Sequence, residues 1–89
     1  MNSRRRYRAQ EAFNEKNMFL SGGKYVKKFN SEREGLLIVN DSTSDLTFKA
    51  GATSFTVKPG ETFNEIINPF VELQITCSGS FRGYIKEEF

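Results

Sequence analysis

The sequence predicts an all-β fold, a small antiparallel β-sandwich or barrel of six to seven short strands with a basic arm or short helix at its N-terminus. Three observations support this prediction. From residue 24 onward the apolar period changes from helical to two, the period of a half-buried strand. Turn-forming residues separate the alternating segments at spacings of about 8 to 12 residues. The clearest alternation covers residues 71–77.

Residues 1–21 are predicted to form a weak amphipathic helix. The segment is rich in helix-favouring residues, and its apolar residues form a ragged stripe of helical period: Tyr7, Ala9, Ala12, Phe13, Met18, Phe19 and Leu20. Such a short helix is marginal in water unless it docks. Gly22-Gly23 then breaks the pattern and is predicted to act as a flexible joint. We therefore expect a basic N-terminal arm over residues 1–23 and a β-sandwich domain over residues 24–89.

The first part of this domain is expected to contain two separate strands and a loop. Tyr25-Val26 begins a short strand that ends near Phe29, and residues 35–40 form a continuous apolar run typical of a strand buried on both faces. Residues 40–45 have the sequence NDSTSD, whose side chains can hydrogen-bond to their own backbone, and this predicts a loop.

A hairpin and a tight turn follow the loop. Apolar and polar residues alternate in residues 46–49 and again in residues 55–57, with Gly51 between the two segments, and this predicts a hairpin. Lys58-Pro59-Gly60-Glu61 predicts a type II turn, because proline sets φ near −65° at the second position and glycine accepts a positive φ at the third.

The last third of the chain is predicted to form three more strands. A short strand covers residues 63–67, Asn68-Pro69 is expected to break it, and residues 71–77 form the next strand. Residues 78–80 then turn the chain into a last strand over residues 81–86. Phenylalanines expected to face inward occur throughout this domain: Phe48, Phe55, Phe63, Phe70 and Phe81.

The charges of the chain are divided between its two ends. Residues 1–34 contain nine Lys and Arg against four Glu, whereas residues 35–89 contain four Lys and Arg against seven Asp and Glu. The basic end opens with a cluster that we expect to dock a partner: Arg4, Arg5, Arg6 and Arg8 around Tyr7. Guanidinium groups pair with phosphate or carboxylate and stack on rings, so the cluster suits nucleic acid or an acidic protein groove. A simply solvated tail is the third interpretation.

Phe13 and Phe19 are also candidate docking residues, because they lie in the arm, where only a neighbouring molecule could cover them. A leader folded back onto its own sandwich explains both residues almost equally well. Under the arm interpretation, deletion of residues 1–21 leaves the sandwich folded and removes attachment to the partner.

Enzyme signatures are missing from the sequence. It contains no histidine, which removes the usual general base near neutral pH and most zinc sites. We therefore expect a non-enzymatic protein without cofactor or metal. Cys77 is the single cysteine, expected as a small buried residue, and no internal disulfide can form. The longest apolar run, residues 36–39, is too short for a signal peptide or a membrane span, which predicts a soluble protein without membrane contact.

Residues 36–86 resemble small β-sandwich virion proteins of tailed bacteriophages, of the head-decoration, neck or tail-appendage type. Three segments carry the resemblance: LLIVNDSTSDLTFKAG, FTVKPGETFNEIINPF and VELQITCSGSFRGYIK. The shared elements are a strand ending in Asn40-Asp41, a turn over residues 57–63, an entry at Pro69-Phe70 and a closing strand over residues 81–84.

The resemblance implies a non-enzymatic structural protein of a phage particle, made in the host cytoplasm and located in the virion. Such proteins repeat around a shell or ring, so the implied partners are further copies of the chain and other virion proteins of the capsid or tail. The alternative is a small nucleic-acid-binding β-barrel that uses the Arg-rich arm. The sandwich is expected to be acidic and to offer no basic strand face, and this weakens the alternative, because the field of an acidic domain opposes a phosphate backbone.

Overall fold

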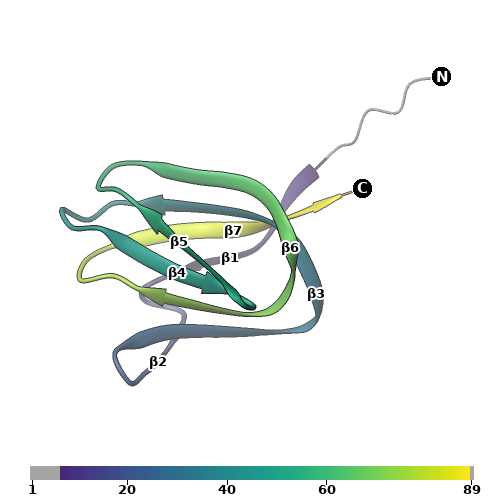
Figure 1. Ribbon diagram of the computed structural model, residues 1–89, viewed down its shortest axis with the longest axis horizontal. Helices are drawn as coiled ribbons and strands as arrows, with labels where there is room; N and C mark the ends of the chain where they lie inside the picture. The colour runs from purple at the N-terminus through teal and green to yellow at the C-terminus, as the bar shows by residue number, and fades with distance from the viewer. Residues whose placement is uncertain (1–6, 89) are drawn as a thin grey trace.

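The computed structural model describes residues 7–88, which form seven β-strands and no helix (Figure 1). The strands are β1 (Tyr7–Asn14), β2 (Phe19–Ser21), β3 (Lys24–Asn40), β4 (Leu46–Ala50), β5 (Thr53–Val57), β6 (Thr62–Thr76) and β7 (Phe81–Glu88). All strand pairs are antiparallel. The predicted all-β fold is confirmed. No helix capable of crossing a membrane occurs in the described part of the chain.

The strands form a single sheet that bends over on itself into two layers (Figure 1). The strand order is β1-β7-β3-β6-β4-β5, and β2 pairs with β3. The long strands β3 and β6 run through both layers. In the first layer, the second half of β3 lies between β7 and the first half of β6. In the second layer, the first half of β3 lies between β2 and the second half of β6, which is followed by β4 and β5.

Where the sequence predicts two breaks between strands, the structure has continuous strands that bend. Strand β3 is continuous where two strands are expected, and β6 continues through Asn68-Pro69, where a break is expected. The register between β3 and β6 shifts on both sides of Arg33, which lies opposite Phe70. Proline lacks an N–H, so its position at an irregular part of the ladder is consistent with the pairing rules for sheets. The predicted turn residues are therefore used to bend the sheet and not to end the strands.

The hydrophobic core lies between the two layers. Its fully buried side chains come from both layers: Leu36, Ile38, Phe81 and Ile85 from the first, and Leu46, Phe48, Leu73 and Ile75 from the second. Three of the phenylalanines predicted to face inward are buried, namely Phe48, Phe70 and Phe81. The other two, Phe55 and Phe63, are only half-buried, with ring centroids 5.0 Å from that of Phe48.

The predicted helix in the N-terminal segment is wrong for the described residues, because residues 7–14 form strand β1. This strand pairs with β7, and Phe13 lies opposite Gly83. A Cβ atom added to Gly83 would lie 2.7 Å from Cζ of Phe13, so the missing side chain provides the space for the ring. Phe13 is 2% exposed and belongs to the core. Phe13 is therefore covered by its own domain, as the interpretation of a folded-back leader expects, and not by a neighbouring molecule.

Gly22-Gly23, predicted to be a flexible joint, is the two-residue turn of the β2–β3 hairpin. Its flanking residues Ser21 and Lys24 pair with each other, and the two glycines have φ angles of 57° and 80°. Positive φ at both central positions is typical of a type I′ turn. The expected boundary between arm and domain therefore falls inside a hairpin, and β1 and β2 belong to the same sheet as the later strands.

The loop over residues 40–45 and the turn over residues 58–61 form as predicted and are joined by Asn40. The Gly60 φ angle is 78°, and the Glu61 N–H donates to the Lys58 carbonyl over 3.0 Å, as in a type II turn. The fully buried Asn40 side chain donates to the carbonyls of Ser44 and Val57, at 2.7 and 2.9 Å. Cys77, expected to be buried, is half-buried beside it, with Sγ 4.0 Å from the Asn40 Oδ1.

Candidate binding surfaces

The outward side of the second layer forms a polar surface that we call the lysine face. Antiparallel pairing brings its side chains onto one side of the sheet, because directly opposed residues share a face. One row crosses the layer from Phe19 through Val26 and Gln74 to Lys49 and Ser54. Two parallel rows of the same face lie on either side of this row. One contains Ser21, Lys24, Thr76, Thr47 and Thr56, and the other contains Lys28 and Glu72.

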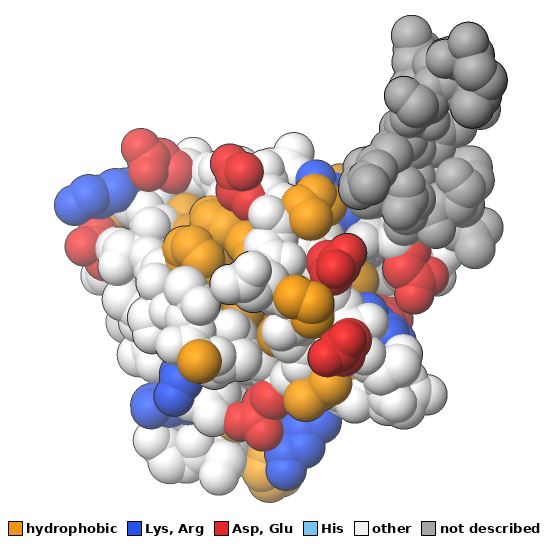
Figure 2. Space-filling view, turned by 45° about the vertical axis from the view of Figure 1, so that its right-hand side comes forward, with side chains coloured by type: hydrophobic (Ala, Val, Ile, Leu, Met, Phe, Trp, Pro, Cys, Tyr) orange, Lys and Arg blue, Asp and Glu red, His pale blue; other side chains and the backbone are white. Residues whose placement is uncertain are grey.

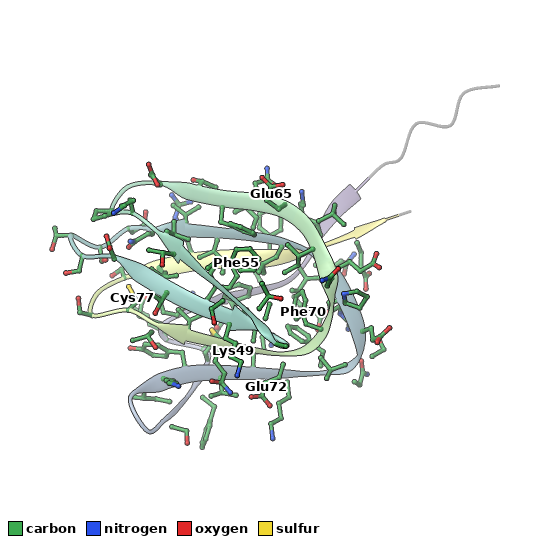
Figure 3. The ribbon with its side chains drawn as sticks, viewed as in Figure 1. Lys49, Phe55, Glu65, Phe70, Glu72 and Cys77 are labelled. Carbon is green, nitrogen blue, oxygen red and sulfur yellow. The ribbon has the colours of Figure 1, made fainter. Side chains whose placement is uncertain are left out.

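The lysine face is basic and contains a hollow of about 570 Å³. The hollow is lined by Phe19, Ser21, Lys24, Val26, Lys28, Glu72 and Gln74. Three lysines of the face, Lys24, Lys28 and Lys49, are exposed. The single acid of this face, Glu72, accepts a hydrogen bond of 2.5 Å from Nε2 of Gln74. Figure 3 shows Lys49 and Glu72 near one another at the lower part of the molecule.

The lysine face corrects the expectation that the sandwich offers no basic strand face. The net negative charge of residues 35–89 is a sum over the whole segment and does not describe one face. The lysine face combines lysines from both halves of the sequence. Lys24 and Lys28 come from β3, and Lys49 comes from β4, which is separated from β3 by β6. Only the register of these three strands brings the lysines onto one side, and a local sequence pattern contains no such information.

A second surface, which we call the seam, lies between β5 and the first half of β6. Among the described strands, β5 pairs only with β4, and residues 62–70 of β6 pair only with β3, so two strand edges face each other without a ladder. The rings of Phe55 and Phe63 fill the space between them, with centroids 4.9 Å apart. Beside these rings is a cavity of about 260 Å³, lined by Ala50, Thr53, Phe55, Ile67 and Asn68.

The seam combines apolar and acidic side chains. Phe63, Glu65 and Ile67 alternate along the side of β6 that faces the seam, and Glu61 precedes the strand. Glu65 is exposed and lies along the upper strand in Figure 3. The space-filling view shows hydrophobic side chains bordered by acidic ones on this side of the molecule (Figure 2). The seam is therefore suited to a partner that carries both apolar and cationic groups.

The predicted docking residues have different positions in the structure. Arg4, Arg5 and Arg6 lie outside the described residues. The backbones of Tyr7 and Arg8 belong to β1. Phe13, a candidate for docking, is instead a core residue, because β7 leaves space for its ring at Gly83. Phe19 is 72% exposed and stands at the edge of the lysine face.

An ion pair connects β1 to the bend of β3. The register of β1 and β7 shifts between Gln10 and Phe13, and Glu11 within this bulge has a positive φ of 49°. Its Oε2 atom lies 2.7 Å from Nε of Arg33, whose side chain is 11% exposed. The hydrogen bond that Arg33 donates to the Glu11 carboxylate raises the pKa of Arg33 above its ordinary value. Because a residue in the left-handed region is strained unless its surroundings hold it, this pair supports the bulge.

No protein-family model matches this chain, and neither a curated protein nor a solved structure is found to be similar to it. Within the described residues, no group of three or more His, Cys, Asp or Glu side chains is placed to hold a metal ion. The two surfaces are accordingly interpreted from their own geometry and charge.

Proposed function

We propose that this chain is a non-enzymatic structural protein of a phage particle, and that it assembles by docking the N-terminal residues of one copy onto the seam of another. The resemblance of residues 36–86 to small virion proteins supports the setting. The lack of histidine supports a non-enzymatic role. The main support for this mode of assembly is the seam. There, two strand edges that are unpaired among the described strands enclose half-buried phenylalanine rings.

The length of the seam supports a short strand as its occupant. An unpaired strand edge is a template for a strand from another chain, which gains main-chain hydrogen bonds on binding. Residues 1–6, which precede β1, are enough to pair with the part of the free β6 edge from Thr62 to Ile67. Six extended residues span about 20 Å, so the segment can cover this part of the edge.

Charge complementarity supports the same occupant. Residues 1–6 contain three consecutive arginines, and the seam carries Glu61 and Glu65 beside Phe55 and Phe63. A guanidinium group pairs with a carboxylate and also stacks on an aromatic ring, so arginine suits both parts of this surface. Because exposed ion pairs are screened by salt, assembly of this kind weakens as ionic strength rises.

Light scattering of the full chain at micromolar concentration tests the proposal. We expect an oligomer that dissociates at high salt. Replacement of Arg4, Arg5 and Arg6 by Ala should give a monomer with an unchanged circular dichroism spectrum. The matched control removes three lysines from the other surface, Lys24→Ala with Lys28→Ala and Lys49→Ala, and should remain oligomeric.

Two results would contradict this assembly. A wild-type protein that stays monomeric over the whole micromolar range would remove the proposed contact between copies. An arginine variant that remains as oligomeric as the lysine control would show that residues 1–6 do not form the contact. Glu61→Gln with Glu65→Gln tests the acceptor side, and it should weaken assembly without changing the fold, because both side chains are exposed.

A further inference from the structure

We propose that the lysine face binds single-stranded nucleic acid, a function that does not depend on the assembly proposed above. The first reason is its charge. Three exposed lysines, Lys24, Lys28 and Lys49, share the face with a single acid, Glu72, which is hydrogen-bonded to Gln74. The lysine face is therefore a local cationic surface, although residues 35–89 as a whole are acidic, and it suits a polyanion.

The second reason is an aromatic ring beside these charges. Phe19 is 72% exposed on the short hairpin strand β2, and its side chain lines the hollow together with Val26 and Lys28. Proteins that bind single strands combine a cationic track for the backbone with aromatic side chains on which bases stack. Stacking needs an unpaired base face, so the ring favours a single strand over a duplex.

The dimensions of the face agree with a short stretch of nucleic acid. Lys24 and Lys28 are four residues apart on β3, which corresponds to about 13 Å along the strand. Lys49 lies two strands away from β3, about 10 Å across the sheet. Stacked nucleotides rise by about 3.4 Å each, so the lysines span about four nucleotides. Sites of this size are at the lower end of the range for a single small β-barrel.

The composition of the face favours nucleic acid over a protein partner. The cores of protein interfaces are depleted in lysine and serine and enriched in aromatic residues, methionine and arginine. The lysine face has the opposite composition, with three lysines, hydroxyl side chains and one phenylalanine. Ser21, Ser54 and Thr47 add hydroxyl groups, which commonly donate to phosphate and sugar oxygens.

The test measures fluorescence anisotropy of a labelled oligothymidine of about 12 nucleotides, which exceeds the expected site size. All proteins carry Arg4→Ala, Arg5→Ala and Arg6→Ala, so that the arginine cluster cannot contribute. We expect binding that weakens with salt, with a slope of about −2 in log K against log salt, because three lysines release counterions from a single strand. Replacement of Lys24, Lys28 and Lys49 by Ala should reduce affinity by at least about tenfold.

The matched control removes three positive charges from outside the lysine face, through Lys58→Ala, Arg82→Ala and Lys86→Ala. Lys58 and Arg82 pair with Asp45 and Asp41, and Lys86 donates to Asn64 in the first layer. This variant should retain most of the affinity. A second prediction is specific to the face, because Glu72→Gln removes its single acid beside Lys28 and should increase affinity about two- to fivefold.

Three results would overturn the proposal. The first is no binding at about 50 mM salt, where electrostatic attraction to nucleic acid is strong. The second is an equal loss of affinity in the lysine-face variant and in the matched control variant, which would show that only the net charge of the protein matters. The third is equally tight binding of a DNA duplex or of polyglutamate, which would assign the face to another kind of polyanion.

Discussion

Strands β1 and β2 each contain a phenylalanine, and the two rings differ in their burial. Phe13 in β1 is 2% exposed, whereas Phe19 in β2 is 72% exposed. Intrinsic propensity does not separate them, because the residue type is the same and both strands lie at an edge of the sheet. The neighbouring strand determines the burial of each ring. Strand β7 presents Gly83 opposite Phe13, whereas the three-residue strand β2 pairs, among the described strands, only with β3. One ring therefore contributes to stability, and the other is available for binding.

The largest expected effect concerns Phe13. Phe13→Ala should lower the free energy of unfolding by about 3–5 kcal/mol, because it leaves a cavity in the core beside Gly83. Urea denaturation followed by circular dichroism measures the change. Deletion of residues 1–14 should unfold the chain for the same reason, contrary to the sequence-based expectation for deletion of residues 1–21. A folded and stable deletion variant would show that β1 is dispensable.

Gly83→Ala should have the next largest effect. The added Cβ would lie 2.3 Å from the Leu37 carbonyl oxygen and 2.7 Å from Cζ of Phe13, so backbone or ring must move. Overpacking of this kind costs about 1–3 kcal/mol of unfolding free energy, measured by the same denaturation experiment. Gly60→Ala is not a suitable control because of its positive φ. Thr56→Ala, at an exposed position of β5, is suitable and should change stability little.

The ion pair between Glu11 and Arg33 should have a smaller effect. A double-mutant cycle with Glu11→Ala and Arg33→Ala should give a coupling energy of about 1 kcal/mol, because the contact is short and the Arg33 side chain is mostly buried. The same cycle on Asp41 and Arg82 is the control. That pair is more exposed, with side chains 37% and 66% accessible, and should give a clearly smaller coupling energy than the Glu11–Arg33 pair. Equal coupling energies would show that burial of Arg33 does not strengthen its pair.

The smallest expected effect on stability belongs to Phe19. Phe19→Ala should change the free energy of unfolding by less than about 0.5 kcal/mol, because the ring is largely exposed. The same variant should weaken oligothymidine binding by about fivefold or more, since loss of one stacking ring costs about 1–3 kcal/mol. A large loss of stability with unchanged binding would reverse the division of roles between the two phenylalanines.

Much of the fold follows from local signals, and the parts that differ depend on contacts between distant residues. The alternation in residues 46–57 and the turn over residues 58–61 need only neighbours in sequence, and both form as predicted. Ala9, Glu11 and Ala12 favour a helix, so the local sequence of β1 predicts a helix. Its conformation is instead determined by pairing with β7, at the opposite end of the described chain. The lysine face depends in the same way on the register of β3, β6 and β4.

At Gly22-Gly23 the structure differs from the predicted joint, although the signal is local. Two adjacent glycines are compatible with a flexible joint, but they equally suit the paired positive φ angles of a tight hairpin. The alternation of Phe19 with Ser21, and of Lys24 with Val26, on either side of these glycines fits the strands that the hairpin joins. Docking roles for Arg4, Arg5 and Arg6 stay predictions, because these residues lie outside the described part of the chain.

The pairing of β1 with β7 also has a consequence for the order of folding. Tyr7 lies opposite Glu88, so among the seven described strands the one that the ribosome makes first pairs only with the one that it makes last. Until β7 emerges, β1 has no ladder and the Phe13 ring has no glycine to pack on. Contacts between such distant residues slow folding, because the entropy of closing a long loop is lost before the contacts form. The nascent chain therefore holds an unpaired, Phe-containing segment until β7 has been made.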